Sequence, residues 1–183
     1  MTNRRHADHE LWKGLVAGMI GGAFGSWMMN QYQAGFQKAA KAWNKSDPRT
    51  ARSGKNRTPK QSQSEDEDAT MKMAQFLAEK VLNRQLSHAQ KKKAGPIIHY
   101  AYGTLAGGAY GAAAEFMPEI RKAVGMAYGT ALFVGGDEVG VPMMHLSESP
   151  TSYPLSVHVN ALASHLVYGF SVELARRAVR AIL

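Results

Sequence analysis

The chain has 183 residues, a net charge of +8 and no cysteine. Without cysteine it can form no disulfide, thiolate metal site or thiol nucleophile. Its length is that of one domain, and its positive charge favours an anionic partner such as a lipid surface or nucleic acid. The mean hydropathy of -0.30 is that of a soluble protein. This average decides little, because it combines apolar blocks with a polar stretch over residues 44–70.

Four apolar stretches rich in glycine and alanine follow one another along the chain. They lie near residues 14–33, 96–117, 123–146 and 155–175. Each has roughly the 20 residues that a helix needs to cross a hydrocarbon core. The sequence therefore predicts a single all-α membrane domain over residues 1–183. Its expected fold is a polytopic four-helix transmembrane bundle with one amphipathic helix and a disordered basic loop.

The first stretch has a small residue at every fourth position. On a helix these residues form one smooth ridge, which lets a second helix backbone approach closely. They are Gly14, Gly18, Gly22 and Ser26. The basic residues before this stretch give it the look of a signal peptide, but it ends in the sequence Trp27-Met-Met-Asn-Gln31 instead of a small-residue cleavage site. We therefore expect a retained helix that packs against another.

A polar segment separates this stretch from the next. Residues 44–65 are expected to be a flexible loop, and the basic residues over 38–60 make it a candidate contact for anionic partners. The capping-box pattern Ser64-Glu-Asp-Glu67 predicts the start of a helix over 66–86. That helix places Ala74, Leu77 and Val81 on one side. It is too charged to cross a membrane, so it is expected to lie at the interface or on the bundle.

Prolines and basic residues mark the ends of the later stretches. Pro96 begins the second stretch, Pro118 ends it, and Pro142 ends the third. Basic residues near the first stretch, in the 118–122 turn and at the carboxyl end predict that both termini are cytoplasmic. An alternative keeps the basic loop on the cytoplasmic side, and the first helix is then re-entrant or peripheral.

Counting 1.5 Å per residue along the predicted spans sorts their polar residues by depth. One cluster collects acids and histidines at the outer end, together with one histidine near mid-depth. Its members are His99, Asp137, Glu138, His145, His158 and His165. Such side chains can carry protons or bind a divalent cation, and the alternative is that they are structural anchors. Neither Glu-x-x-His nor His-Glu-x-x-His occurs, so a metal stays an open question.

A second group of charges lies toward the inner end. Glu115 and Glu173 are expected to form ion pairs with Arg121, Arg176 or Arg177, and the alternative is that they are structural anchors. His165 is expected to hydrogen-bond across helices, to Tyr102 or Tyr128, with a proton relay as the alternative.

Several functions have no support in the sequence. It contains no phosphate-binding loop, no nucleophile elbow and no DNA-reading motif. We therefore expect no enzymatic activity and no cofactor. Nucleic-acid binding by residues 38–60 is not favoured, because few aromatic side chains accompany the positive charges. The expected partners are a lipid bilayer and a second copy of the chain or a membrane complex.

Motifs along nearly the whole chain except 44–64 carry a family resemblance. They are Gly14 to Gly25, Trp27 to Gln31, Glu67 to Thr70, His99 to Gly103, Gly107 to Gly111, Ala114-Glu115, Pro118, Gly125, Gly129, Asp137 to Pro142, Tyr153-Pro154, His158, Ala163 to Gly169, Glu173 and Arg176-Arg177. In these the chain resembles the YagU-type inner-membrane proteins, a family of unknown function. The resemblance implies a bacterial inner-membrane location and a loose association with acid tolerance.

Three functions follow as hypotheses. The leading one is an integral, multi-pass inner-membrane protein of unknown activity, acting as a scaffold or as an element that responds to pH or a cation. The second is a small oligomeric transporter or channel for protons or a cation. The third is a peripheral helical protein that binds anionic partners through its basic loop.

Overall fold

The fold was obtained as a computed structural model and describes residues 2–46 and 68–183. Every regular element in these two ranges is a helix, as expected. Most of the predicted loop 44–65, the basic segment 38–60 beyond residue 46 and the capping box at 64–67 lie outside the described residues. Residues 44–46, placed in the loop by the sequence, instead continue the first helix.

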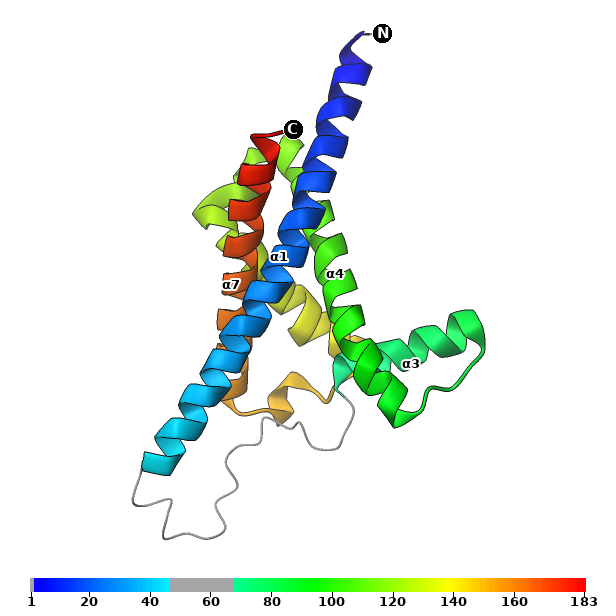
Figure 1. The fold of residues 1–183 in the computed structure, drawn as a ribbon, viewed down its shortest axis with the longest axis vertical. Helices are drawn as coiled ribbons and strands as arrows, with labels where there is room; N and C mark the ends of the chain where they lie inside the picture. The colour runs from blue at the N-terminus through cyan, green and yellow to red at the C-terminus, as the bar shows by residue number, and fades with distance from the viewer. Residues whose placement is uncertain (1, 47–67) are drawn as a thin grey trace.

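Three long helices form the body of the protein (Figure 1). They are α1 (Thr2–Ser46), α4 (His88–Phe116) and α7 (Leu155–Arg180). α1 lies between the other two and runs antiparallel to both, so the start of α1 and the end of α7 lie at the same end of the molecule (Figure 1). The core between them is built around Met29, Tyr110, Tyr168 and Val172.

Glycine faces glycine where α1 meets α4. A Cβ added at Gly14 would lie 2.6 Å from the Gly111 carbonyl oxygen, and one added at Gly18 would lie 2.8 Å from the Gly111 Cα. At Gly22 the added Cβ would lie 3.0 Å from the Gly107 Cα. The ridge of small residues in α1 therefore meets a matching ridge in α4, and the two backbones touch because neither carries side chains there.

The interfaces with α7 use the same principle. Gly21 of α1 packs on the Val172 carbonyl, where an added Cβ would approach within 2.7 Å of the oxygen. On another side of α7, Gly169 faces Gly129 of the short helix α5 (Met126–Leu132), whose Cα would lie 3.0 Å from a Cβ added at Gly169. Helix α7 is thus in direct backbone contact with elements on two sides.

The third apolar stretch is a series of short elements. A 3₁₀ segment, η1 (Pro118–Gly125), leads into α5, followed by the π-helix η2 (Phe133–Gly140) and the short α6 (Val141–Met143). Ala123, Val124 and Gly125 all have positive φ, at 51°, 52° and 80°, which turns the chain sharply between α4 and α5. A further 3₁₀ turn, η3 (Pro150–Ser152), precedes α7. Residues 126–143 are nevertheless helical without a break, so the helix expected over 123–146 is shorter at both ends and contains a π-helical segment.

The amphipathic helix is α3 (Ala69–Leu82), shorter than the predicted range 66–86. Asp68 caps it, accepting a hydrogen bond from the Met71 amide at 2.8 Å. Of the three residues expected on its apolar side, Ala74 is buried, whereas Leu77 and Val81 are exposed. Helix α3 packs on the beginning of α4 and projects to the side (Figure 1).

The prediction of a four-helix transmembrane bundle is wrong. None of the described helices combines the length and the apolar character needed to cross a membrane. The physical reason is that a pattern of small residues favours close helix packing without making a helix hydrophobic. Glycine and alanine allow close packing but add little transfer free energy, and polar residues such as His99 and Asn160 lie among them. The expected multi-pass topology depended on these spans.

The glycine contact predicts opposite effects at two positions of one helix. Gly18→Ala should lower the free energy of unfolding by about 1–3 kcal/mol, because the new Cβ overlaps the α4 backbone. Gly35→Ala should raise it by about 0.5–1 kcal/mol, because nothing lies within 4 Å of that position and alanine favours the helix. Denaturant unfolding checks both variants. Equal effects at the two positions would contradict the packing described here.

Candidate functional site

Two adjacent acids, Asp137 and Glu138, lie on the π-helix η2. The turn is wider than an α-turn, because the Val141 amide bonds to the Gly136 carbonyl, five residues earlier. An added Cβ at Gly140 would lie 3.0 Å from the Gly135 carbonyl oxygen, so glycine permits the wide turn. Short π-helical segments are rare and are often found at functional sites.

Glu138 pairs with His158 near the start of α7. The Glu138 Oε1 atom lies 2.6 Å from His158 Nδ1, and the Pro150 carbonyl oxygen lies 3.1 Å from Nε2. Both ring nitrogens therefore face acceptors, and only the doubly protonated imidazolium can donate to both. The hydrogen bond to Glu138 raises the pKa of His158 above its ordinary 6.5, although partial burial opposes this. The two side chains are about one quarter exposed, at 24% and 23%.

Asp137 faces His165 instead, two turns further along α7. Its Oδ2 atom lies 3.8 Å from His165 Nδ1. That nitrogen also lies 2.9 Å from the Ala161 carbonyl oxygen, one turn earlier on the same helix, and donates to it. Partial burial raises the pKa of Asp137. The charge of His165 opposes this shift, and the charge of Glu138 reinforces it. The two acids of η2 thus contact different histidines of one helix.

His99 and Tyr102 bring α4 to the same cluster. Burial lowers the pKa of His99, and a positive charge on His165 lowers it further, while Asp68 opposes both. The His99 Nε2 atom is buried without a hydrogen-bond partner among the described residues. The Tyr102 hydroxyl reaches the π-helix at Gly136, and burial together with Asp137 raises its pKa.

Five of the six predicted cluster residues are therefore linked by contacts or electrostatic interactions. His145 lies apart, in a turn with a φ of 57°, and its side chain is exposed. In the described part of the chain no group of three or more His, Asp and Glu side chains is arranged to hold a metal ion. The geometry is that of two His–carboxylate pairs, one hydrogen-bonded at 2.6 Å and one 3.8 Å apart.

The opposite end of the bundle holds a buried ionic network. Glu173 is fully buried and accepts hydrogen bonds from Arg176 Nε at 2.7 Å, Arg177 Nε at 2.7 Å and the Tyr110 hydroxyl at 2.9 Å. Burial raises the pKa of Glu173, but the bonds and charges of the two arginines outweigh it and hold that pKa below its usual value. These contacts tie α7 to α4 through Tyr110.

A second acid extends the network to α1. Glu115 Oε1 accepts a hydrogen bond from Arg180 Nε at 3.1 Å and lies 3.5 Å from Arg176 Nη1. Arg180 also pairs with Glu10 of α1. Arg121, the partner expected for Glu115, lies apart, and its Nε is 3.5 Å from the Pro118 carbonyl oxygen. The network therefore connects all three long helices.

Some participants were missed by the sequence reading. Arg180 follows Arg176 by four residues and Glu173 by seven, a helical spacing that could have placed it on the same face. Tyr110 offered no such signal, because its contact with Glu173 joins positions 63 residues apart. The two tyrosines predicted to hydrogen-bond with His165 make other contacts. The Tyr128 hydroxyl donates to the Ala106 carbonyl at 2.7 Å.

Comparison with known proteins gives a family without a known activity. Residues 48–174 match the DUF1440 family, described as proteins of unknown function. The chain belongs to this family. No curated protein and no solved structure matches it. DUF1440 membership covers both His–carboxylate pairs and Glu173, and it assigns a role to none of them. The YagU-type naming expected from the motifs is not confirmed by this match.

Removing the buried acid should destabilise the fold. Glu173→Gln removes the nearer of the two carboxylates that face the buried Arg176, so we expect a loss of about 3 kcal/mol in the free energy of unfolding. Glu119→Gln, an equal change at an exposed position, should alter it by less than about 0.5 kcal/mol. Chemical denaturation checks both. Comparable effects for the two variants would show that the buried network contributes little.

The two histidines should titrate on opposite sides of their ordinary value. In NMR titrations His158 should show a midpoint above 6.5 and His99 one below it. Since the folded state raises the pKa of His158, its contribution to stability is complete below pH 6.5 and is lost as pH rises through the raised value. Glu138→Gln should return the His158 midpoint toward 6.5, whereas Glu148→Gln, at an exposed acid, should not.

Proposed function

We propose that this protein is a non-enzymatic, proton-responsive helical element. The observation that carries the proposal is that two consecutive acids on one π-helix pair with two histidines of one neighbouring helix. Glu138 meets His158 at 2.6 Å, and Asp137 meets His165 at 3.8 Å. The Glu138–His158 pair raises the pKa of His158, so this contact depends on pH.

The direction of the response follows from the pKa shifts. A group whose pKa is raised by folding stabilises the folded arrangement when it is protonated. His158 has a raised pKa because of its hydrogen bond to Glu138, so mild acid favours the arrangement in which this pair holds η2 on α7. His99 has a lowered pKa, so its protonation at lower pH places a second positive charge near His165 and opposes that arrangement. We therefore expect η2 to be held on α7 over a range of mildly acidic pH and released outside it.

The element that moves is η2. A π-helix is less stable than an α-helix of the same length, and η2 is followed by only one short helical turn, α6. Beyond the buried Phe133 ring beside His165 at its first residue, its attachment to α7 consists of the two polar pairs, unlike the glycine-packed contact of α5 with α7. Loss of the Glu138–His158 pair would release η2 and leave the bundle intact.

The inner-membrane location expected from the sequence is kept as part of this proposal, without membrane spans. It is supported by large apolar side chains exposed on all three long helices, among them Trp27, Leu105 and Leu174, at 46%, 67% and 45%. Surfaces with many exposed large apolar side chains are typical of contacts with lipid or with another protein. Recovery of the full chain in the soluble fraction after cell breakage would contradict the location alone.

Spin labels can measure the movement of η2 directly, because the chain has no cysteine of its own. One pair of cysteines replaces Val139 on η2 and Leu155 at the start of α7, both exposed. We expect a narrow distance distribution at about pH 6 and a broader, longer one above the raised pKa of His158. Adding Glu138→Gln should make the distribution broad at both values of pH.

A reference pair separates local release from unfolding. Cysteines replacing Ile20 on α1 and Leu174 on α7 are exposed and lie on helices in direct contact. Their distance should not change over the same pH range. A Val139–Leu155 distance that is equally insensitive to pH in the unmodified site would overturn the proposed function.

A further inference from the structure

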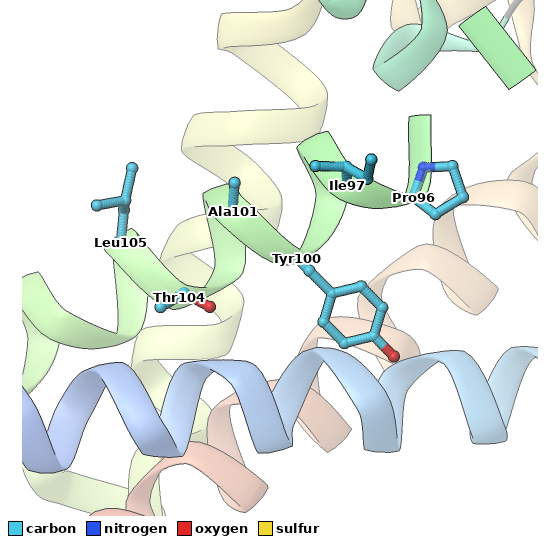
Figure 2. Close-up of a pocket in the computed structure, with 6 residues that line it drawn as sticks. All are labelled: Pro96, Ile97, Tyr100, Ala101, Thr104 and Leu105. Carbon is cyan, nitrogen blue, oxygen red and sulfur yellow. The ribbon is translucent and has the colours of Figure 1, made fainter. Parts of the chain in front are cut away.

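An open hollow of about 600 Å³ lies along the outer face of α4 (Figure 2). Its lining consists of Pro96, Ile97, Tyr100, Ala101, Thr104 and Leu105. Ile97 and Leu105 are 68% and 67% exposed, which is unusual for large aliphatic side chains. Figure 2 shows Ile97, Ala101 and Leu105 on the side of α4 that faces away from α1. The hollow therefore offers an apolar strip to the surroundings.

One wall of the hollow is fixed by a contact with α1. Tyr100 points toward α1 (Figure 2), and its hydroxyl accepts a hydrogen bond from Asn30 Nδ2 at 3.3 Å. Thr104 lies one turn further along α4, where the Thr104 Cα would be 3.0 Å from a Cβ added at Gly22. The close packing of α1 on α4 thus holds this wall in place without a bound ligand.

Two lysines stand at one end of the strip. Lys92 and Lys93 precede Pro96 and Ile97 by four residues each, so each lysine lies one turn before a lining residue on the same helix face. Both lysines are exposed. A pair of ammonium groups thus adjoins an apolar strip that runs over eight residues, or roughly 12 Å of helix.

We propose that this face of α4 binds an anionic phospholipid at a bilayer surface. The lipid phosphate contacts Lys92 and Lys93, and the first part of an acyl chain lies along Ile97, Ala101 and Leu105. Lysine ammonium groups bind phosphate as point charges, and burial of apolar surface supplies the rest of the affinity. The site rests on the membrane location kept in the proposed function, but it uses no histidine or acid of the proton-responsive cluster, so either can fail without the other.

Charge decides between a lipid and a second copy of the chain. A second copy brings another net charge of +8, which disfavours its approach to the lysine pair. An anionic headgroup is attracted to the same pair. The hollow is also open along its length, which suits a chain lying at an interface. An anionic phospholipid has a negative head for the lysine pair and an apolar tail for the strip that follows it along α4.

Vesicle co-flotation of the full chain tests the lysine pair. Binding should be strong to equimolar phosphatidylglycerol and phosphatidylcholine and weak to pure phosphatidylcholine. The double change Lys92→Gln and Lys93→Gln should weaken binding to the anionic vesicles by roughly 25-fold, since each lysine near the surface contributes about fivefold. The matched control, Lys38→Gln with Lys41→Gln, removes the same charge from exposed positions on α1 and should weaken binding by less than about threefold.

The apolar strip is tested in the same assay. Ile97→Asn with Leu105→Asn should reduce binding at least tenfold, whereas Val159→Asn, at an exposed position of α7, should leave it nearly unchanged. Circular dichroism and denaturant unfolding establish that each variant is folded. Equal losses for target and control pairs would overturn the proposal, as would binding to both vesicle types alike. A change in oligomeric mass caused by the strip variant, with vesicle binding retained, would assign the face to a second copy instead.

Discussion

The fold depends on backbone contact between helices, which the absence of side chains makes possible. Where Gly18 of α1 crosses Gly107 and Gly111 of α4, no Cβ fits between the two backbones. Three residues further along α1, Gly21 meets the α7 backbone at Val172 in the same manner. A helix held at van der Waals distance on two sides has one position in which both contacts are satisfied. The remaining contacts are built on that position.

The geometry of the Glu173 network and that of the His–carboxylate pairs both depend on this packing. At one end, Glu173 can be fully buried because Arg176 and Arg177 of its own helix bond to it and the closely packed α4 adds Tyr110. Removing a carboxylate from water is costly, and it is tolerated here because all its bonds are made within the protein. At the other end the helices are joined by η2, where the contacts are fewer and partly exposed. One end is therefore fixed, and the other is free to respond to solution conditions.

The sequence predicted the helices better than their environment. The spacing of Gly14, Gly18 and Gly22 correctly indicated a helix face for close packing, because that requirement is local and periodic. The same residues misled the assignment of membrane spans, since small residues give close packing whether or not the surroundings are apolar. The sequence does not predict the π-helix, because the glycines that leave room for its wide turn also suit an ordinary packed helix. Counting the helical rise along the predicted helices places Asp137 and Glu138 near His158. Only the structure shows which acid faces which histidine.

The position of α1 has a consequence for how the protein is made. Its partners on α4 begin near residue 103, and those on α7 begin near residue 168. Helix α1 is therefore synthesised before both of its partners, and its glycine faces stay uncovered until α4 and α7 have been made. Contacts between distant parts of a chain form late and slow folding. During that interval α1 presents two smooth faces and several aromatic side chains, so this stage is the one at which the nascent chain most needs protection from aggregation.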